Sequence, residues 1–240
     1  MSLLLIAGVT KRFGGITANR DVSFEVAPGE LVGIIGPNGS GKSTLFEIIS
    51  GFYRPDTGTV RLDGGPLTGL SPDHVCRLGV ARTFQKLRPF AGLTVVDNVM
   101  VGALTRTLDV RHARARAREL LDQVGLAEKG DEYARTLSTG QRKRLELARA
   151  LATEPRVLLL DEVTGGVDQR SIPGLVQLIR DLHQGGLTLL VIEHNMRVIT
   201  AMAQRIVALY LGEKIADGAP DVVTRDRRVV EAYLGQAYVQ

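Results

Sequence analysis

The chain has 240 residues, a net charge of +4 and a single cysteine, Cys76. Hydrophobic residues at 44% and charged residues at 23% are ordinary values for a globular protein. One cysteine excludes an internal disulfide framework, and no stretch approaches the roughly 20 apolar residues of a membrane span. In the opening segment MSLLLIAGVTKR the basic residues follow the apolar run, which is the wrong order for a signal peptide. We therefore expect a soluble, cytoplasmic protein.

Two segments in the first third of the chain have the pattern of β-hairpins. VSFEVAPGELVGI (22–34) places apolar runs on both sides of a Pro-Gly pair, and GTVRLDGGPL (58–67) does so around a Gly-Gly pair. We expect both to form antiparallel strands laid along the front of the core.

The segment LVGIIGPNGSGKST (31–44) has a β-rich apolar strand at 31–35, then a glycine loop, then a helix start. Four residues fit the phosphate-loop pattern at its required spacing: Gly36, Gly41, Lys42 and Ser43. Glycines let backbone N–H groups turn inward around a phosphate, and Lys42 reaches the terminal phosphates. The Ser43 hydroxyl is a ligand for Mg²⁺. Strand, loop and helix stand in the order that nucleotide binding needs.

Residues 86–152 lose the strand pattern and become helical, whereas 1–85 and 153–240 have the pattern of one α/β core. In the helical part, Arg111, Arg114 and Arg118 would share one helix face. The net charge fits either a solvated surface or an anionic partner. Few aromatic side chains lie near these arginines to stack on bases, so we expect no nucleic-acid partner.

LSTGQ (137–141) opens a helix pattern. Ser138 and Gln141 have the spacing of a capping box, with Gly140 between them. A capped amphipathic helix is the simpler interpretation. Because a helix N-terminus offers free N–H groups and a partial positive charge, the same stretch can also hold an anion.

Two later strands end in side chains that can bind a metal ion or take part in catalysis. VLLLDE (157–162) is typical of a central parallel strand, and its two carboxylates fall where α/β sheets bind ligands. Asp161 would hold Mg²⁺ through water, and Glu162 would orient and polarise the attacking water. TLLVIEH (188–194) ends in His194. Such a histidine is more often structural, but its place at the same sheet edge favours a contact with the γ-phosphate.

In this order, the phosphate loop, Gln85 in RTFQ, LSTGQ, VLLLDE and VIEH resemble the ATP-binding subunits of ABC transporters over the whole chain. The resemblance implies an α/β P-loop NTPase core with an antiparallel β subdomain and an inserted helical subdomain. It also implies that Gln85 senses the γ-phosphate and Mg²⁺, that His194 is the switch histidine, and that Phe13 lies against adenine. Gly165, Gly166, Val167 and Asp168 match the loop that crosses between two ATPase subunits.

The same resemblance supplies the expected site. The catalytic residues would be Lys42, Gln85, Glu162 and His194, and the Mg²⁺ ligands would be Ser43, Gln85 and Asp161. The ATP-binding residues would be Phe13, Gly36, Pro37, Asn38, Gly39, Ser40, Gly41, Lys42, Ser43, Thr44, Ser138, Gly140 and Gln141. Thr139 stands where the family has glycine, Val163 where it has proline, and Val167 where it has leucine. We expect these apolar changes at 163 and 167 to alter loop stiffness.

The stretch ARTFQKLRPFAGLTVVDNVMVGAL (81–104) and the ending VVEAYLG (229–235) resemble the ATPase subunits of branched-chain amino acid importers. The implied protein hydrolyses ATP at the cytoplasmic face of the inner membrane. Its partners would be integral permease subunits and a second ATPase subunit, the same chain or a paralogue, in a head-to-tail dimer. Urea or amide uptake and lipopolysaccharide export stay open as functions. So do two rivals, a soluble ABC-type ATPase acting on DNA or ribosomes and a nucleotide-binding module that does not hydrolyse.

Overall fold

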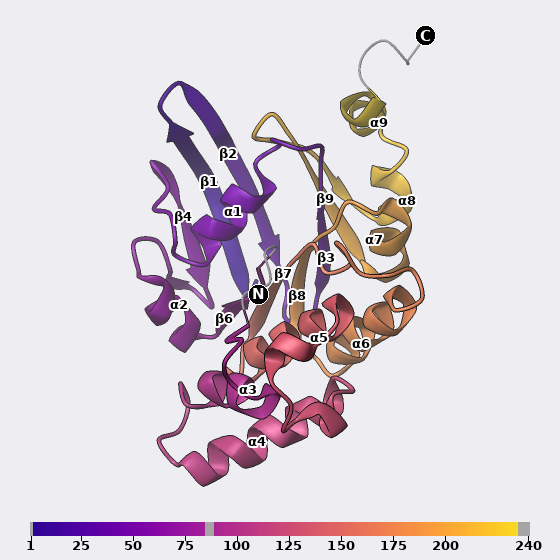
Figure 1. Cartoon of the computed structure of the whole chain (residues 1–240). Coiled ribbons are helices and arrows are strands. Elements are labelled where there is room, and N and C mark those ends of the chain that lie inside the picture. The colour runs from indigo at the N-terminus through magenta and orange to yellow at the C-terminus, as the bar shows by residue number, and fades with distance from the viewer. Residues whose placement is uncertain (1, 85–88, 235–240) are drawn as a thin grey trace.

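The computed structural model describes residues 2–84 and 89–234, and its centre is a six-stranded sheet (Figure 1). The strand order is β10-β9-β3-β8-β7-β6, and every neighbouring pair is parallel except β9 with β10. The strands are β3 (Leu31–Ile35), β6 (Val80–Arg82), β7 (Val157–Asp161), β8 (Thr188–Ile192), β9 (Arg205–Tyr210) and β10 (Glu213–Gly218). Every residue of β3, β7 and β8 is buried, which explains their continuous apolar runs.

A second, antiparallel sheet has the order β2-β1-β4-β5. Its strands are β1 (Leu4–Phe13), β2 (Ile16–Val26), β4 (Thr57–Leu62) and β5 (Gly65–Pro66). Helix α1 (Lys42–Ile49) packs its apolar side into the core that both sheets share, where Phe46 is fully buried. The predicted hairpin at 58–67 is confirmed, because β4 pairs with β5.

The hairpin expected at 22–34 is wrong. β2 pairs with β1 in the antiparallel sheet, whereas β3 lies between β8 and β9 in the other sheet. The residues of β3 are apolar on both faces and fully buried, so this strand needs a sheet with cover on both sides. The Pro-Gly segment therefore carries the chain from one sheet to the other. The hairpin partner of β2 is β1, across the turn Gly14–Gly15.

The remaining elements are helical. They are α2 (Pro72–Leu78), α3 (Val95–Ala103), α4 (Val110–Gln123), α5 (Thr139–Leu151), α6 (Ile172–Gln184), α7 (Met196–Met202), α8 (Pro220–Val223) and α9 (Arg227–Leu234), with 3₁₀ turns at η1 (Ala127–Lys129) and η2 (Ala134–Thr136). Helices α3, α4 and α5 follow β6 and precede β7, and α3 and α4 lie at the lower end of the molecule in Figure 1. None of the helices in the described ranges is both long and apolar enough to cross a membrane.

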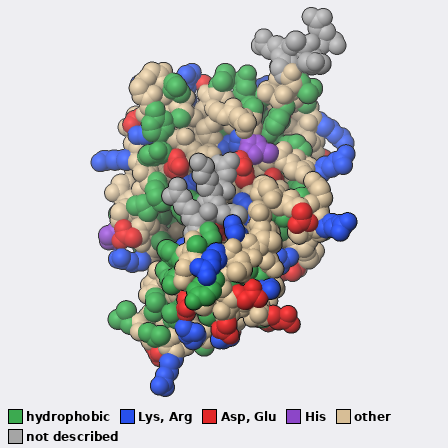
Figure 2. Space-filling view, viewed as in Figure 1, with side chains coloured by type: hydrophobic (Ala, Val, Ile, Leu, Met, Phe, Trp, Pro, Cys, Tyr) green, Lys and Arg blue, Asp and Glu red, His purple; other side chains and the backbone are tan. Residues whose placement is uncertain are grey.

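The predicted start of the helix after Leu137 is confirmed. The Ser138 hydroxyl accepts from the N–H of Gln141 at 3.3 Å, and the Gln141 side chain accepts from the N–H of Ser138 at 2.9 Å. The predicted arginine-rich helix is α4, where Arg114 pairs with Asp97 and Arg118 with Asp131. Figure 2 shows Lys and Arg side chains spread over the visible face rather than gathered in one patch.

Candidate ATP-binding and hydrolysis site

The phosphate loop connects β3 to α1, and its glycines are required by the backbone. Gly36, Gly39 and Gly41 have φ angles of 149°, 79° and 97°. A Cβ atom on Gly36 would lie 2.1 Å from the carbonyl oxygen of Leu209, and one on Gly41 would lie 2.2 Å from that of Ala18. The helix has no side-chain cap at Gly41, so its first N–H groups are available to an anion.

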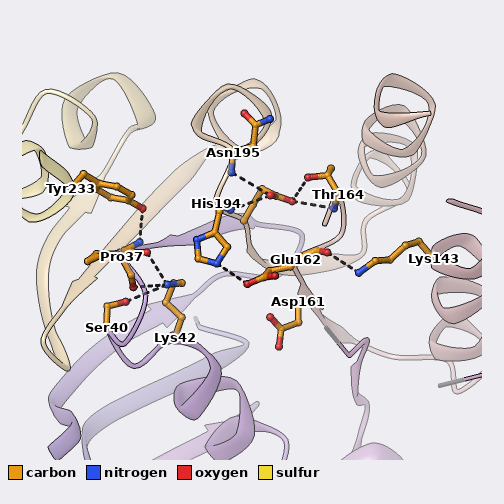
Figure 3. Close-up of polar contacts among 12 residues, drawn as sticks. Pro37, Ser40, Lys42, Lys143, Asp161, Glu162, Thr164, His194, Asn195 and Tyr233 are labelled. Atoms are coloured by element: carbon orange, nitrogen blue, oxygen red, sulfur yellow. Dashed lines mark hydrogen bonds and ion pairs between the residues drawn. The ribbon is translucent and has the colours of Figure 1, made fainter. Parts of the chain in front are cut away.

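Lys42 lies inside this loop. Its ammonium group donates to the carbonyl oxygens of Gly36 at 2.7 Å and Pro37 at 3.0 Å, and to the Ser40 hydroxyl at 3.3 Å (Figure 3). Burial lowers the pKa of Lys42, while the nearby carboxylates of Glu162 and Asp161 act to raise it. The loop therefore holds a buried cation close to its own N–H groups, which favours a phosphate.

A cavity of about 700 Å³ opens beside the loop. It is lined by Gly15, Ile16, Thr17, Ala18, Arg20, Asn38, Gly39, Ser40, Gly41, Lys42, Ser43, Thr44, Glu162, His194 and Leu211. The fold thus brings the phosphate loop together with the two predicted residues that follow β7 and β8. This volume suits a small-molecule ligand.

Glu162 and His194 are in direct contact. Oε1 of Glu162 lies 2.6 Å from Nε2 of His194, and because an ionised carboxylate only accepts, Nε2 is the donor (Figure 3). Glu162 has a φ of 51°, in the left-handed region that non-glycine residues rarely adopt. Strained backbone of this kind persists where the surroundings hold it, and it clusters at active sites. The pair can accept a proton from water beside a bound phosphate.

Asp161 is buried at the end of β7. One oxygen, Oδ2, lies 2.7 Å from Nη2 of Arg82, and Oδ1 has no hydrogen-bond partner in the described ranges. Ser43 and Asp161 line the same cavity of about 830 Å³. A buried carboxylate oxygen without a partner and a hydroxyl that lines the same cavity are both oxygen donors, which fits Mg²⁺ with phosphate and water as its other ligands.

Three predicted residues form a separate group. Ser138, Gly140 and Gln141 line a polar hollow of about 280 Å³ that also includes Val167 and Ser171. This hollow is not the cavity beside the phosphate loop, so one chain does not join its own LSTGQ segment to its own loop.

Phe13 and Gln85 stay as predictions. Phe13 ends β1, is 41% exposed and packs edge-on against Tyr53, with ring centroids 5.1 Å apart. Phe13 is not among the described residues that line the cavity beside the phosphate loop, whereas Gly15, in the turn that follows β1, is one of them. Gln85 lies outside the described residues.

The structure adds residues that we did not predict. Tyr233 in α9 accepts a hydrogen bond from the N–H of Gly36 at 2.8 Å, and burial raises the pKa of this phenol. Glu193 is buried and accepts from Thr164 Oγ1 at 2.9 Å and from the N–H of His194 at 3.0 Å. The ending VVEAYLG contains Tyr233, but the sequence pattern gives it no link to the loop.

Lys143 in α5 also reaches this site. Its ammonium group donates to the carbonyl oxygen of Glu162 at 2.8 Å (Figure 3). Burial lowers the pKa of Lys143, while neighbouring carboxylates, first Glu146 and then Glu162, act to raise it.

An ATP-binding cassette is defined by the mostly parallel sheet with its phosphate loop, the acidic pair at the end of β7, the histidine after β8 and the capped helix α5. A family model described as "ABC transporter" matches residues 19–165, and the chain belongs to this family. A second model, "Branched-chain amino acid ATP-binding cassette transporter", matches residues 213–239.

Individual relatives and solved structures show which members of the family the chain is similar to. The chain is 37% identical to the high-affinity branched-chain amino acid transport ATP-binding protein LivG of Escherichia coli K12, over 98% of both chains. It is 34% identical to the lipopolysaccharide export system ATP-binding protein LptB of Haemophilus influenzae, over 99% of both. A nucleotide-free cassette from an ABC transporter has a TM-score of 0.89 at 30% identity, covering 98% of this chain and 100% of that one. A dimeric cassette in a post-hydrolysis state, bound to ADP and Pi, has a TM-score of 0.82 at 29% identity, covering 90% and 98%.

Proposed function

We propose that two such cassettes hydrolyse ATP between them and drive permease subunits that import branched-chain amino acids. The contact between Glu162 and His194, beside the phosphate-loop cavity, is the observation that carries the hydrolytic role. The solute class is inferred from the identity to LivG and from the family model over 213–239.

In this mechanism the loop N–H groups and Lys42 bind the β- and γ-phosphates. Glu162 takes a proton from a water molecule while the oxygen of that water attacks the γ-phosphorus. The bond between the γ-phosphorus and the bridging oxygen of ADP breaks. His194 holds the Glu162 carboxylate and contacts the γ-phosphate. Ser43 and Asp161, with Gln85, would hold Mg²⁺, which neutralises charge on the phosphates when bound.

We further propose that the two cassettes pair head to tail. Ser138, Gly140 and Gln141 of one chain would bind the γ-phosphate held by the other, which agrees with their separation from the loop of their own chain. The helical part, 86–152, would form the subdomain that presents this segment. A dimeric relative supports such a pair.

The permease would dock on the segment 85–100. Phe90 in this segment lines the cavity of about 830 Å³ that lies between α2, β6, α3 and α5. A partner there would keep the protein peripheral, at the cytoplasmic face of the inner membrane. Lipopolysaccharide export is the second candidate, because the identity to LptB is 34% against 37% to LivG, but the family model over 213–239 favours amino acids.

Mixing two inactive variants tests the pairing. Lys42→Ala damages the loop of its own site, and Ser138→Arg blocks the segment that serves the neighbour. Together they can build one sound composite site, so we expect ATPase activity on mixing that neither variant has alone. No recovery on mixing, with a destabilised Ser138→Arg, would mean that Ser138 is only a helix cap. Vesicles containing the cassette with permease subunits of each class then distinguish leucine uptake from lipopolysaccharide export.

A further inference from the structure

We propose that Lys143 is a positioning residue that holds the backbone of the catalytic Glu162 of its own chain against the helix that presents LSTGQ. This inference rests on the proposed head-to-tail function.

The first observation is the contact. Lys143 is 5% exposed and lies in α5, just after the LSTGQ segment, and its ammonium group donates to the carbonyl oxygen of Glu162 at 2.8 Å. This carbonyl is its only hydrogen-bond acceptor among residues 2–84 and 89–234. A buried ammonium group needs such an acceptor, so the contact constrains both partners.

The second observation is what the carbonyl belongs to. Glu162 has its left-handed φ of 51°, and the same oxygen accepts from the N–H of Gly165 at 3.1 Å. Gly165 begins the loop that we expect to cross to the partner. The carbonyl oxygen of Glu162 therefore accepts hydrogen bonds both from α5 and from the loop that we expect to cross to the partner.

These contacts give Lys143 its role. Helix α5 carries Ser138 at its N-cap and Lys143 in its first turns. The hydrogen bond from Lys143 holds the backbone of Glu162 against α5, and the Glu162 carboxylate acts on the ATP of this chain. A base misplaced by about 1 Å loses up to about a hundredfold in rate, so loss of the contact from Lys143 is sufficient to slow hydrolysis at this site.

Substitution of Lys143 separates positioning from folding. We expect Lys143→Met to bind ATP normally and keep KM within about twofold while kcat falls at least about tenfold. Lys143→Arg keeps a donor and should recover most of that loss. Lys129→Met, which removes a half-exposed lysine from the same helical part, is the matched control and should behave as wild type. A kcat unchanged in folded Lys143→Met, or no recovery with Lys143→Arg, would overturn the proposal.

Subunit mixing then asks which site Lys143 serves. If it acts on Glu162 of its own chain, Lys143→Met mixed with Ser138→Arg leaves one sound site, and activity should rise above that of either chain alone. Mixed with Lys42→Ala it leaves none, and activity should not rise. The opposite pattern would mean that Lys143 only supports the segment serving the partner, and the proposal would be wrong. The mixture of Lys42→Ala with Ser138→Arg is the control, and its failure would instead refute the proposed pairing.

Discussion

Arg82 and Asp161 form a buried ion pair between neighbouring strands β6 and β7, with Nη2 and Oδ2 2.7 Å apart and side-chain exposures of 7% and 2%. The guanidinium also lies 5.3 Å from the centre of the Phe84 ring. The carboxylate that is expected to meet Mg²⁺ is therefore already paired with an internal cation.

Removing that cation leaves a buried charge. We expect Arg82→Gln to lower the free energy of unfolding of the nucleotide-free protein by about 3–5 kcal/mol, and Mg²⁺ with ADP to restore part of it. Arg156→Gln, at the exposed pair with Asp63, should cost less than about 1 kcal/mol. Urea unfolding with and without Mg²⁺ and ADP measures both, and equal losses in the two variants would contradict the prediction.

Glu162→Gln should keep ATP binding but slow hydrolysis by about 10² to 10⁴, the usual contribution of a positioned base. Because the ATP bound between the two cassettes is no longer hydrolysed, we also expect an ATP-bound dimer on size-exclusion chromatography. Glu128→Gln, at an exposed glutamate, is the control. Near-normal turnover in Glu162→Gln would remove this residue from the catalytic role.

Phe13→Ala should weaken ATP binding about five- to hundredfold, since a stacked base contributes about 1–3 kcal/mol. Stacking acts on the ground state and the transition state alike, so kcat should change little. Calorimetric titration of ATP checks this, with Phe52→Ala, an exposed ring that packs on Phe84, as the control. Unchanged affinity would show that adenine lies elsewhere.

Phe90→Glu should uncouple transport while the isolated subunit keeps its ATPase activity. The Phe90 ring lies 4.6 Å from the Arg149 guanidinium and is 43% exposed. A charge at this exposed apolar position would disfavour the docking of a partner helix. Leu87, the other docking residue that we predict, lies outside the described part. Leu108→Glu, at a 95% exposed residue, is the control, and both variants are tested in permease-containing vesicles. If Phe90→Glu unfolds the chain, the docking prediction fails.

Asp217 makes stability sensitive to acid. Burial, the largest single cause, acts to raise its pKa, but the hydrogen bonds and charges of Arg205 and Lys214 together outweigh it, so the pKa lies below the ordinary 3.8. A lowered pKa means that the stabilisation is present above the unfolded value and is lost as the pH falls through the folded one. We expect unfolding free energy to drop below about pH 4, less steeply in Asp217→Asn than in the wild type or Asp122→Asn. Parallel curves for all three would contradict this.

The local elements could be predicted because short patterns encode them. Strands at 31–35, 157–161 and 188–192 are fully buried, so apolar residues run through them without alternation. The capping box at Ser138 needs only two side chains three residues apart. The prediction of a hairpin at 22–34 was wrong because a turn signal shows where the chain bends, but it does not show which strand the next segment pairs with.

The sequence by itself determined the phosphate loop, the ends of the catalytic strands and the resemblance to the ABC family, since each depends on residues close together in the chain. Only the tertiary structure decided the contacts that hold the site: Lys143 with Glu162 across 19 residues, Arg82 with Asp161 across 79, and Tyr233 with Gly36 across 197. The physical reason is that a buried cation or amide must find its acceptor in the space where the elements pack, and that space depends on sheet order. Strand order 3-8-7-6 places β6 beside β7 and sets the end of β7 beside that of β8, which no single segment specifies.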